Sequence, residues 1–336
     1  MTESKGTIRV LKHESKALEG NPLGDPHVRN LPVYLPPGYE ENGAGNYPSV
    51  YLLSGFTGRG SMMLNESSFE PNIAERLDIL IGSGDIAPMI AVLPDCFTRY
   101  GGSQYINSSA TGDYETYLTE ELVPFVDENF RTVPDRAARA VAGKSSGGYG
   151  ALIMAMRHSD KFGYAASIAG DCYFEAGYKP DLRKSFRGMG GKPLEIVDKF
   201  WDEEKKKGGN DFDALNAIGM ASCYSPNPGS ELGFDLPLDL ETGEILEGVW
   251  QRWLEHDPVH LAEKHADSLR SMELLYIEAG TSDEFGLDIG ARVLSKKLTE
   301  LGIDHVHEEF EGGHFNINYR YNYTLRAISG KMAEVR

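Results

Sequence analysis

The segment that most constrains the fold of this 336-residue chain is a Gly-x-Ser-x-Gly run centred on Ser145. The small residues before it, 140–142, predict a buried strand, and residues 151–157 are strong helix formers. We therefore expect a strand that turns sharply into a helix and leaves the Ser145 hydroxyl exposed. Gly143 and Gly147 suit such a turn, because side chains there would collide with the neighbouring strand and helix.

A competing motif lies on the same residues. Gly143-Lys144-Ser145 could end a phosphate-binding loop of the Gly-x-x-x-x-Gly-Lys-Ser type. That loop needs a glycine at position 138, where the chain has Ala138. The five residues before Gly143 also have the pattern of a strand, so the sequence favours the serine turn over nucleotide binding.

Composition excludes several classes of protein. Lysine and arginine number 33 against 51 aspartates and glutamates, a net charge of −18, which argues against nucleic acid and anionic membranes as partners. The three cysteines are far apart and predict no disulfide framework. No run of about 18 apolar residues occurs. We expect a soluble cytoplasmic protein, although a secreted protein without its signal would look the same. Whether the chain forms a homo-oligomer stays open.

Short apolar runs alternate with helical spacing along most of the chain. This alternation predicts an α/β fold with a mostly parallel sheet covered by helices on both faces. The predicted strands lie within 7–20, 30–39, 47–53, 89–93, 140–144, 164–169, 273–279 and 304–310, and the predicted helices are 69–81, 114–128, 288–301 and 316–332.

The composition changes at 172–268, which predicts a cap-like insert in a core made of 1–171 and 269–336. Turn-forming residues gather at 188–191, 202–210 and 225–229. Because the insert follows the strand next to Ser145, we expect it to lie over the mouth of the site. Its aromatic residues either line a pocket or form the insert's own core, and both interpretations stay open. These residues are Tyr173, Phe174, Tyr178, Phe200, Trp201, Trp250 and Trp253.

A serine nucleophile needs a base, and the base needs a carboxylate to orient it. His314 follows the last predicted strand, and Asp283 follows the strand before it. Both positions lie at carboxyl ends of strands, where active groups gather in such sheets. We predict Ser145 as nucleophile, His314 as general base and then acid, and Asp283 as the orienting carboxylate. Asp171, after the strand at 164–169, is the alternative carboxylate.

The tetrahedral intermediate needs two hydrogen-bond donors. We predict the backbone N–H of Ser146 and that of Phe56, in the loop after the strand at 47–53. The alternative is that Phe56 only fills the core. Further substrate contacts are expected from Gly55, Thr57, Asp171 and Tyr173.

His305 and His307 lie on one face of a predicted strand, where two histidines could ligate a metal ion. No third ligand is spaced near them, so we predict edge-strand residues and no metal.

Together these motifs resemble the putative-esterase (esterase D-like) family of α/β-hydrolases, which includes S-formylglutathione hydrolases, enterochelin-type and feruloyl esterases. The resemblance implies an α/β-hydrolase fold, the same triad and oxyanion donors, and neither metal nor organic cofactor. The insert departs from the compact members, so no particular substrate carries over. The resembling segments are 20–26, 33–39, 51–56, 93–95, 121–124, 143–148, 280–283 and 313–314.

We therefore expect a serine carboxylic-ester hydrolase that acts through an acyl-enzyme on small to medium esters. Two alternatives stay open. The first is an acyltransferase that uses the same triad with an alcohol acceptor. The second is a non-catalytic binding module that has kept the fold.

Overall fold

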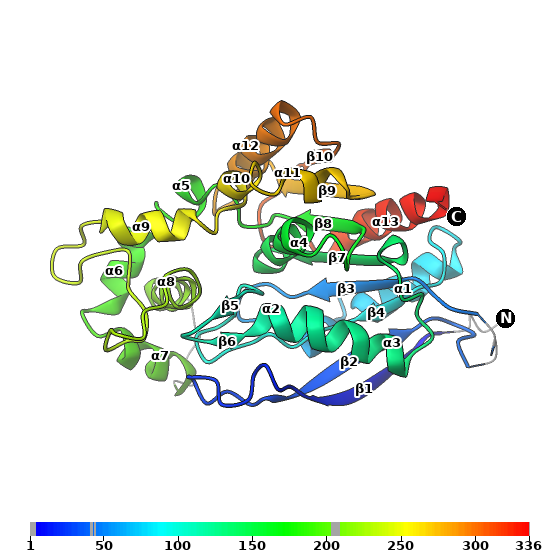
Figure 1. The fold of residues 1–336 in the computed structure, drawn as a ribbon, viewed down its shortest axis with the longest axis horizontal. Coiled ribbons are helices and arrows are strands. Elements are labelled where there is room, and N and C mark those ends of the chain that lie inside the picture. The colour runs from blue at the N-terminus through cyan, green and yellow to red at the C-terminus, as the bar shows by residue number, and fades with distance from the viewer. Residues whose placement is uncertain (1–4, 41–42, 44, 203–208, 336) are drawn as a thin grey trace.

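The computed structural model describes residues 5–40, 43, 45–202 and 209–335, and its centre is an eight-stranded sheet (Figure 1). The strand order is β1-β2-β4-β3-β7-β8-β9-β10. β2 is antiparallel to both β1 and β4, and all later pairs are parallel, so the predicted mostly parallel sheet is confirmed. These strands are β1 (Thr7–Glu14), β2 (Val28–Leu35), β3 (Ser49–Leu53), β4 (Ile90–Val92), β7 (Arg139–Lys144), β8 (Tyr164–Ile168), β9 (Leu274–Gly280) and β10 (Val306–Phe310).

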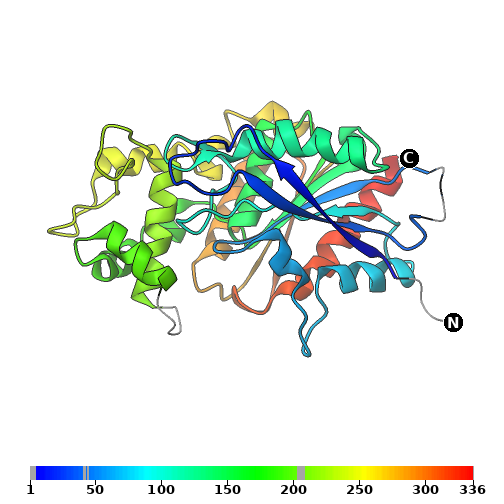
Figure 2. The same cartoon turned by 90° about the horizontal axis from the view of Figure 1, so that it is seen from below.

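Successive side chains of the central strands point alternately into two separate hydrophobic cores. Tyr51 and Leu53 of β3 face one core, and Val50 and Leu52 face the other. The first core is covered by α4, α12 and the helical run at 114–129, and the second by α1 and α13. Figure 2 shows these layers on opposite sides of the sheet. The bounds are α1 (Ile73–Gly82), α4 (Ser146–Arg157), α11 (Ala266–Arg270), α12 (Leu287–Glu300), α13 (Tyr321–Val335) and the 3-10 turns η1 (Gly60–Leu64), η3 (Arg136–Ala138) and η4 (Asn318–Arg320).

Two local features depart from the sequence prediction. The predicted helix 69–81 begins only at Ile73, because Asn72 caps it in a reciprocal capping box with Glu75. The predicted helix 114–128 consists of α2 (Tyr114–Thr116), a π-helical turn (Tyr117–Leu122) and α3 (Val123–Asn129). Pro124 lies in the first turn of α3 and has no N–H to donate back to the preceding turn, which accounts for the change of helical pitch.

Most helices of residues 172–268 gather beyond the end of the sheet in Figures 1 and 2. The helix at 258–261 instead packs against α4 and α12. The predicted exposed turn at 202–210 falls mainly on 203–208, outside the described residues. A short hairpin of β5 (Asn107–Ser108) and β6 (Gly112–Asp113) lies beside these helices. The helices are α5 (Phe174–Gly177), α6 (Leu182–Met189), α7 (Pro193–Asp202), α8 (Asn210–Tyr224), α9 (Glu247–Leu254) and α10 (Pro258–Leu261).

The aromatic residues of this region divide between core and surface. Trp250 and Trp253 are fully buried, and Trp253 packs on Tyr178 and Tyr224 with ring centroids 5.8 and 5.5 Å away. Trp201 instead lines an open groove, where its indole N–H donates to the carbonyl of Arg99. The buried rings belong to the same cluster as the first core of the sheet. The insert boundaries at 172 and 268 remain predictions.

None of the helices in the described ranges is both long and apolar enough to cross a bilayer.

Candidate active site

Ser145 sits in a strained turn between β7 and α4. Its backbone has φ 59° and ψ −127°, a conformation that costs a non-glycine residue about 1–3 kcal/mol. The turn is fixed on both sides: the Ser145 N–H donates to Ile168 O at 2.9 Å, and its carbonyl accepts the Tyr149 N–H at 3.0 Å. A Cβ at Gly147 would lie 2.1 Å from the Leu53 carbonyl oxygen, and one at Gly143 would lie 2.5 Å from Gly147. Only glycines allow this close approach.

His314 and Asp283 meet above the carboxyl ends of β9 and β10. The His314 Nδ1 lies 2.9 Å from Asp283 Oδ2. The other carboxylate oxygen accepts the backbone N–H groups of Phe285 at 2.9 Å and Leu287 at 3.4 Å, which fixes the plane of the carboxylate. The Asp283 side chain is completely buried and that of His314 is 6% exposed. This arrangement favours the tautomer in which Nε2 is free to accept a proton.

A neighbouring carboxylate, which the sequence analysis did not identify, holds the backbone of the histidine loop. The His314 N–H donates to Glu284 Oε2 at 2.5 Å. A side chain at Gly313 would lie 2.6 Å from the same carboxylate. Glu284 is adjacent to Asp283, so the loop after β9 contacts both the ring and the backbone of the histidine. The position of Glu284 next to Asp283 in the sequence is the signal that could have identified it.

Ser145 and His314 line a common cavity of about 160 Å³. Gly55, Phe56, Ser146 and Asp171, all predicted from the sequence, line it too. The sequence analysis did not assign the other lining residues to the site. They are Lys144, Gly177, Asp181, Phe212, Asn216, Phe285, Leu287 and Phe315, with Tyr178 proposed only as one of several aromatics.

The two predicted oxyanion donors are backbone N–H groups. In the described ranges, neither the Phe56 N–H nor the Ser146 N–H has a protein acceptor, so both are available to a ligand. The Phe56 ring packs edge-on against Phe212 at 5.9 Å. A Cβ on Gly219 would lie 2.8 Å from that ring. The ring is partly buried against the core, and this packing holds the loop that carries the Phe56 N–H beside the cavity.

Asp171 lies in the cavity wall without bonding the imidazole. Gln104 Nε2 lies 3.5 Å from Asp171 Oδ2. Burial raises the pKa of Asp171, while the charge of His314 and hydrogen bonds from Tyr178, Gln104 and Ser146 act in the opposite direction. The carboxylate in contact with the His314 ring is that of Asp283, as the preferred sequence interpretation expected.

Two predicted substrate contacts lie elsewhere. Thr57 lines the neighbouring open groove and donates its N–H to Gly101 O at 2.7 Å. Tyr173 caps α5, and its N–H donates to Asp257 Oδ1 at 2.9 Å. We therefore do not carry Thr57 and Tyr173 into the proposed site.

The two candidate metal ligands, His305 and His307, lie in different surroundings. His305 bonds Ser295 Oγ at 2.8 Å and the Ile303 carbonyl at 2.9 Å. His307 is on the edge strand β10, and burial lowers its pKa. Among the described residues, no three potential ligands come together to hold a metal ion.

Fold and site together define the class of protein. A serine at the strand-to-helix turn, with the acid and the histidine after the last two strands of a mostly parallel sheet, is the arrangement of α/β-hydrolases. The model of the family described as "Putative esterase" matches residues 26–328, and the chain belongs to that family.

Individual relatives agree with this assignment. The chain is 32% identical over 167 residues to an endo-1,4-beta-xylanase/feruloyl esterase of Xylanibacter ruminicola, covering 48% of this chain and 22% of that protein. It is 28% identical over 176 residues to the S-formylglutathione hydrolase of Mus musculus, covering 50% and 58%. The chain thus spans less than two thirds of these relatives. A solved ferulic acid esterase superposes with a TM-score of 0.63 at 20% identity over 98% of this chain and 99% of that one, which shows the shared fold.

Proposed function

We propose that this protein is a serine carboxylic-ester hydrolase that acts through an acyl-enzyme on small to medium esters. The observation that carries the proposal is the buried Asp283–His314 hydrogen bond together with the shared cavity that His314 and the strained Ser145 line. Membership of the esterase family supports the same conclusion.

In this mechanism His314 Nε2 removes the proton of Ser145 as the serine oxygen attacks the ester carbonyl carbon. Asp283 stabilises the imidazolium that forms. The Phe56 and Ser146 N–H groups donate to the carbonyl oxygen as it becomes negative. His314 then gives its proton to the departing alcohol, which leaves Ser145 acylated.

Deacylation repeats these steps with water. His314 removes a proton from water, the resulting hydroxide attacks the acyl carbon, and Ser145 leaves with the proton restored. An acyltransferase would use an alcohol in place of water at this step. The difference lies in the acceptor, so acceptor dependence is what separates the two activities.

The lining of the cavity supports an ester with a small acyl or aryl group. Phe212, Phe285 and Phe315 supply aromatic surface in a volume of about 160 Å³. Two of the similar proteins are named as feruloyl or ferulic acid esterases. Hydroxycinnamate esters therefore belong among the first substrates to test.

A panel of 4-nitrophenyl, thioester and hydroxycinnamate esters, with and without added alcohols, tests the proposal. We expect turnover without an added alcohol and formation of free acid as the main product. Turnover that requires the alcohol and yields a new ester would identify an acyltransferase. No turnover of any ester by folded protein would favour a binding module.

A further inference from the structure

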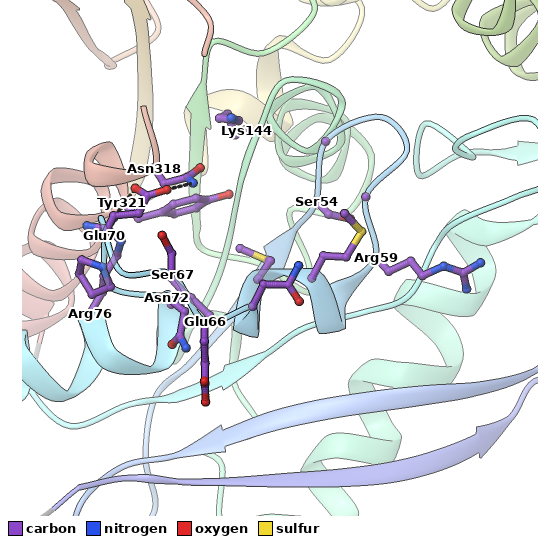
Figure 3. Close-up of a pocket in the computed structure, with 17 residues that line it drawn as sticks. Ser54, Arg59, Glu66, Ser67, Glu70, Asn72, Arg76, Lys144, Asn318 and Tyr321 are labelled. Atoms are coloured by element: carbon purple, nitrogen blue, oxygen red, sulfur yellow. Dashed lines mark hydrogen bonds and ion pairs between the residues drawn. The ribbon is translucent and has the colours of Figure 1, made fainter. Parts of the chain in front are cut away.

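A second cavity, of about 340 Å³, opens beside the catalytic one. Figure 3 shows the residues that line it. Gly55 and Lys144 line both cavities. A Cβ at Gly55 would lie 3.9 Å from the Ser145 hydroxyl oxygen, so the second cavity begins next to the nucleophile. Its far walls come from η1, from the segment before α1 and from the start of α13. The mechanism above uses none of these walls.

Most charges in this cavity are already neutralised by partners. Glu70 accepts hydrogen bonds from Arg76 Nη2 at 2.9 Å and from Asn318 Nδ2 at 2.8 Å. Arg59 lies 3.2 Å from a carboxylate oxygen of Asp95. Glu66 is exposed, and its side chain extends away from Lys144 in Figure 3.

Lys144 is the exception. Within the described ranges its ammonium group has no hydrogen-bond partner and no carboxylate within 4.0 Å. Burial lowers its pKa, and the more distant Glu70 and Asp283 do not offset this effect. A partly buried ammonium without a close partner is costly, and a ligand carboxylate would remove that cost.

We propose that this second cavity is a subsite for a carboxylate carried by the ester substrate, with Lys144 as its ion-pair partner. The inference rests on the proposed esterase function and narrows its substrate class to esters that bear a single negative charge. One uncompensated cation matches a monoanion better than a phosphate dianion, which would need more than one.

The test compares each charged ester with a neutral counterpart of similar shape. Mono-4-nitrophenyl adipate and its adipamide analogue place the carboxylate or amide on the acyl side. 4-Acetoxybenzoate and 4-acetoxybenzamide place it on the alcohol side. The readout is the ratio of kcat/KM for the charged ester to that for the neutral one, because this ratio cancels any general loss of activity.

In Lys144→Gln we expect this ratio to fall about 10- to 100-fold for one of the two pairs, the range of a charged hydrogen bond. Lys144→Arg should restore most of the ratio. Lys331→Gln removes an exposed lysine of α13 that pairs with Glu334, and should leave the ratio unchanged. The pair that responds identifies the side of the ester that occupies the second cavity.

A ratio that Lys144→Gln leaves unchanged in both pairs, while the wild type turns over the neutral esters, would overturn the subsite alone. If the wild type hydrolyses none of the four esters, the proposed function fails, and this inference fails with it. An equal fall in Lys331→Gln would attribute the effect to net charge and also overturn the subsite.

Discussion

Replacement of Asp283 by Asn changes one atom in the completely buried partner of His314. The Asn oxygen can keep the bonds from the Phe285 and Leu287 N–H groups, and the amide nitrogen then faces Nδ1, 2.9 Å from the present Oδ2. An amide N–H donates to Nδ1 and forces the proton onto Nε2, so His314 can no longer accept the serine proton. In serine proteases this change of tautomer costs about 10⁴ in kcat.

We therefore expect Asp283→Asn to lower kcat by about 10³- to 10⁴-fold, with a loss of stability of at most about 1–3 kcal/mol. The assay is the steady-state hydrolysis of 4-nitrophenyl acetate, with circular dichroism and thermal unfolding as controls for folding. Asp171→Asn is the matched control, because Asp171 is a buried carboxylate that lines the catalytic cavity and accepts a hydrogen bond from Gln104. It should change KM or stability more than kcat. If Asp283→Asn retains kcat within tenfold while Asp171→Asn loses it, the assignment is reversed.

Two further perturbations test how the surroundings support the site. Gly219→Ala places a Cβ 2.6 Å from Tyr100 O and 2.8 Å from the Phe56 ring. It should therefore move the loop that carries the Phe56 N–H and lower kcat at least about tenfold. An unchanged kcat would contradict the idea that α8 positions this loop. Burial lowers the pKa of His256 from 6.5 to about 4. Between these two pH values the unfolded chain binds a proton that the folded protein does not. Acidification from pH 6.5 to 4 should therefore lower the free energy of unfolding of the wild type by at most about 3 kcal/mol more than that of His256→Phe, as measured by urea unfolding. Parallel curves of unfolding free energy against pH would refute this prediction.

The core of the site could be predicted from sequence because it lies where strands end. Ser145, Asp283 and His314 lie within four residues of the carboxyl ends of β7, β9 and β10, and parallel strands bring these ends to one edge of the sheet. Local patterns therefore suffice to indicate that these side chains gather there. Strand ends alone do not decide which of the two carboxylates bonds the histidine, because that depends on loop geometry; the preference for Asp283 over Asp171 rests on its place one strand–helix–strand unit before His314.

The walls of the site could not be predicted in the same way. Tyr178 and Phe212 reach the cavity only because the chain brings α5 and α8 close to the turn at Ser145. Lys144 occupies the unspecified position between Gly143 and Ser145 in the serine motif, and its ammonium group gains significance only from the cavity that Glu70 and Asn318 also line. These are contacts between residues far apart in sequence, which periodicity and motif spacing do not encode.

The measurement that tests the account most directly is covalent labelling by a fluorophosphonate, followed by mass-spectrometric mapping of the modified residue. We expect a single adduct on Ser145 and loss of ester hydrolysis in step with labelling. Ser145→Ala should neither be labelled nor hydrolyse esters, with a rate at least about 10³-fold lower and an unchanged fold. An adduct on another residue, or full activity in Ser145→Ala, would contradict the central claim that Ser145 is the nucleophile.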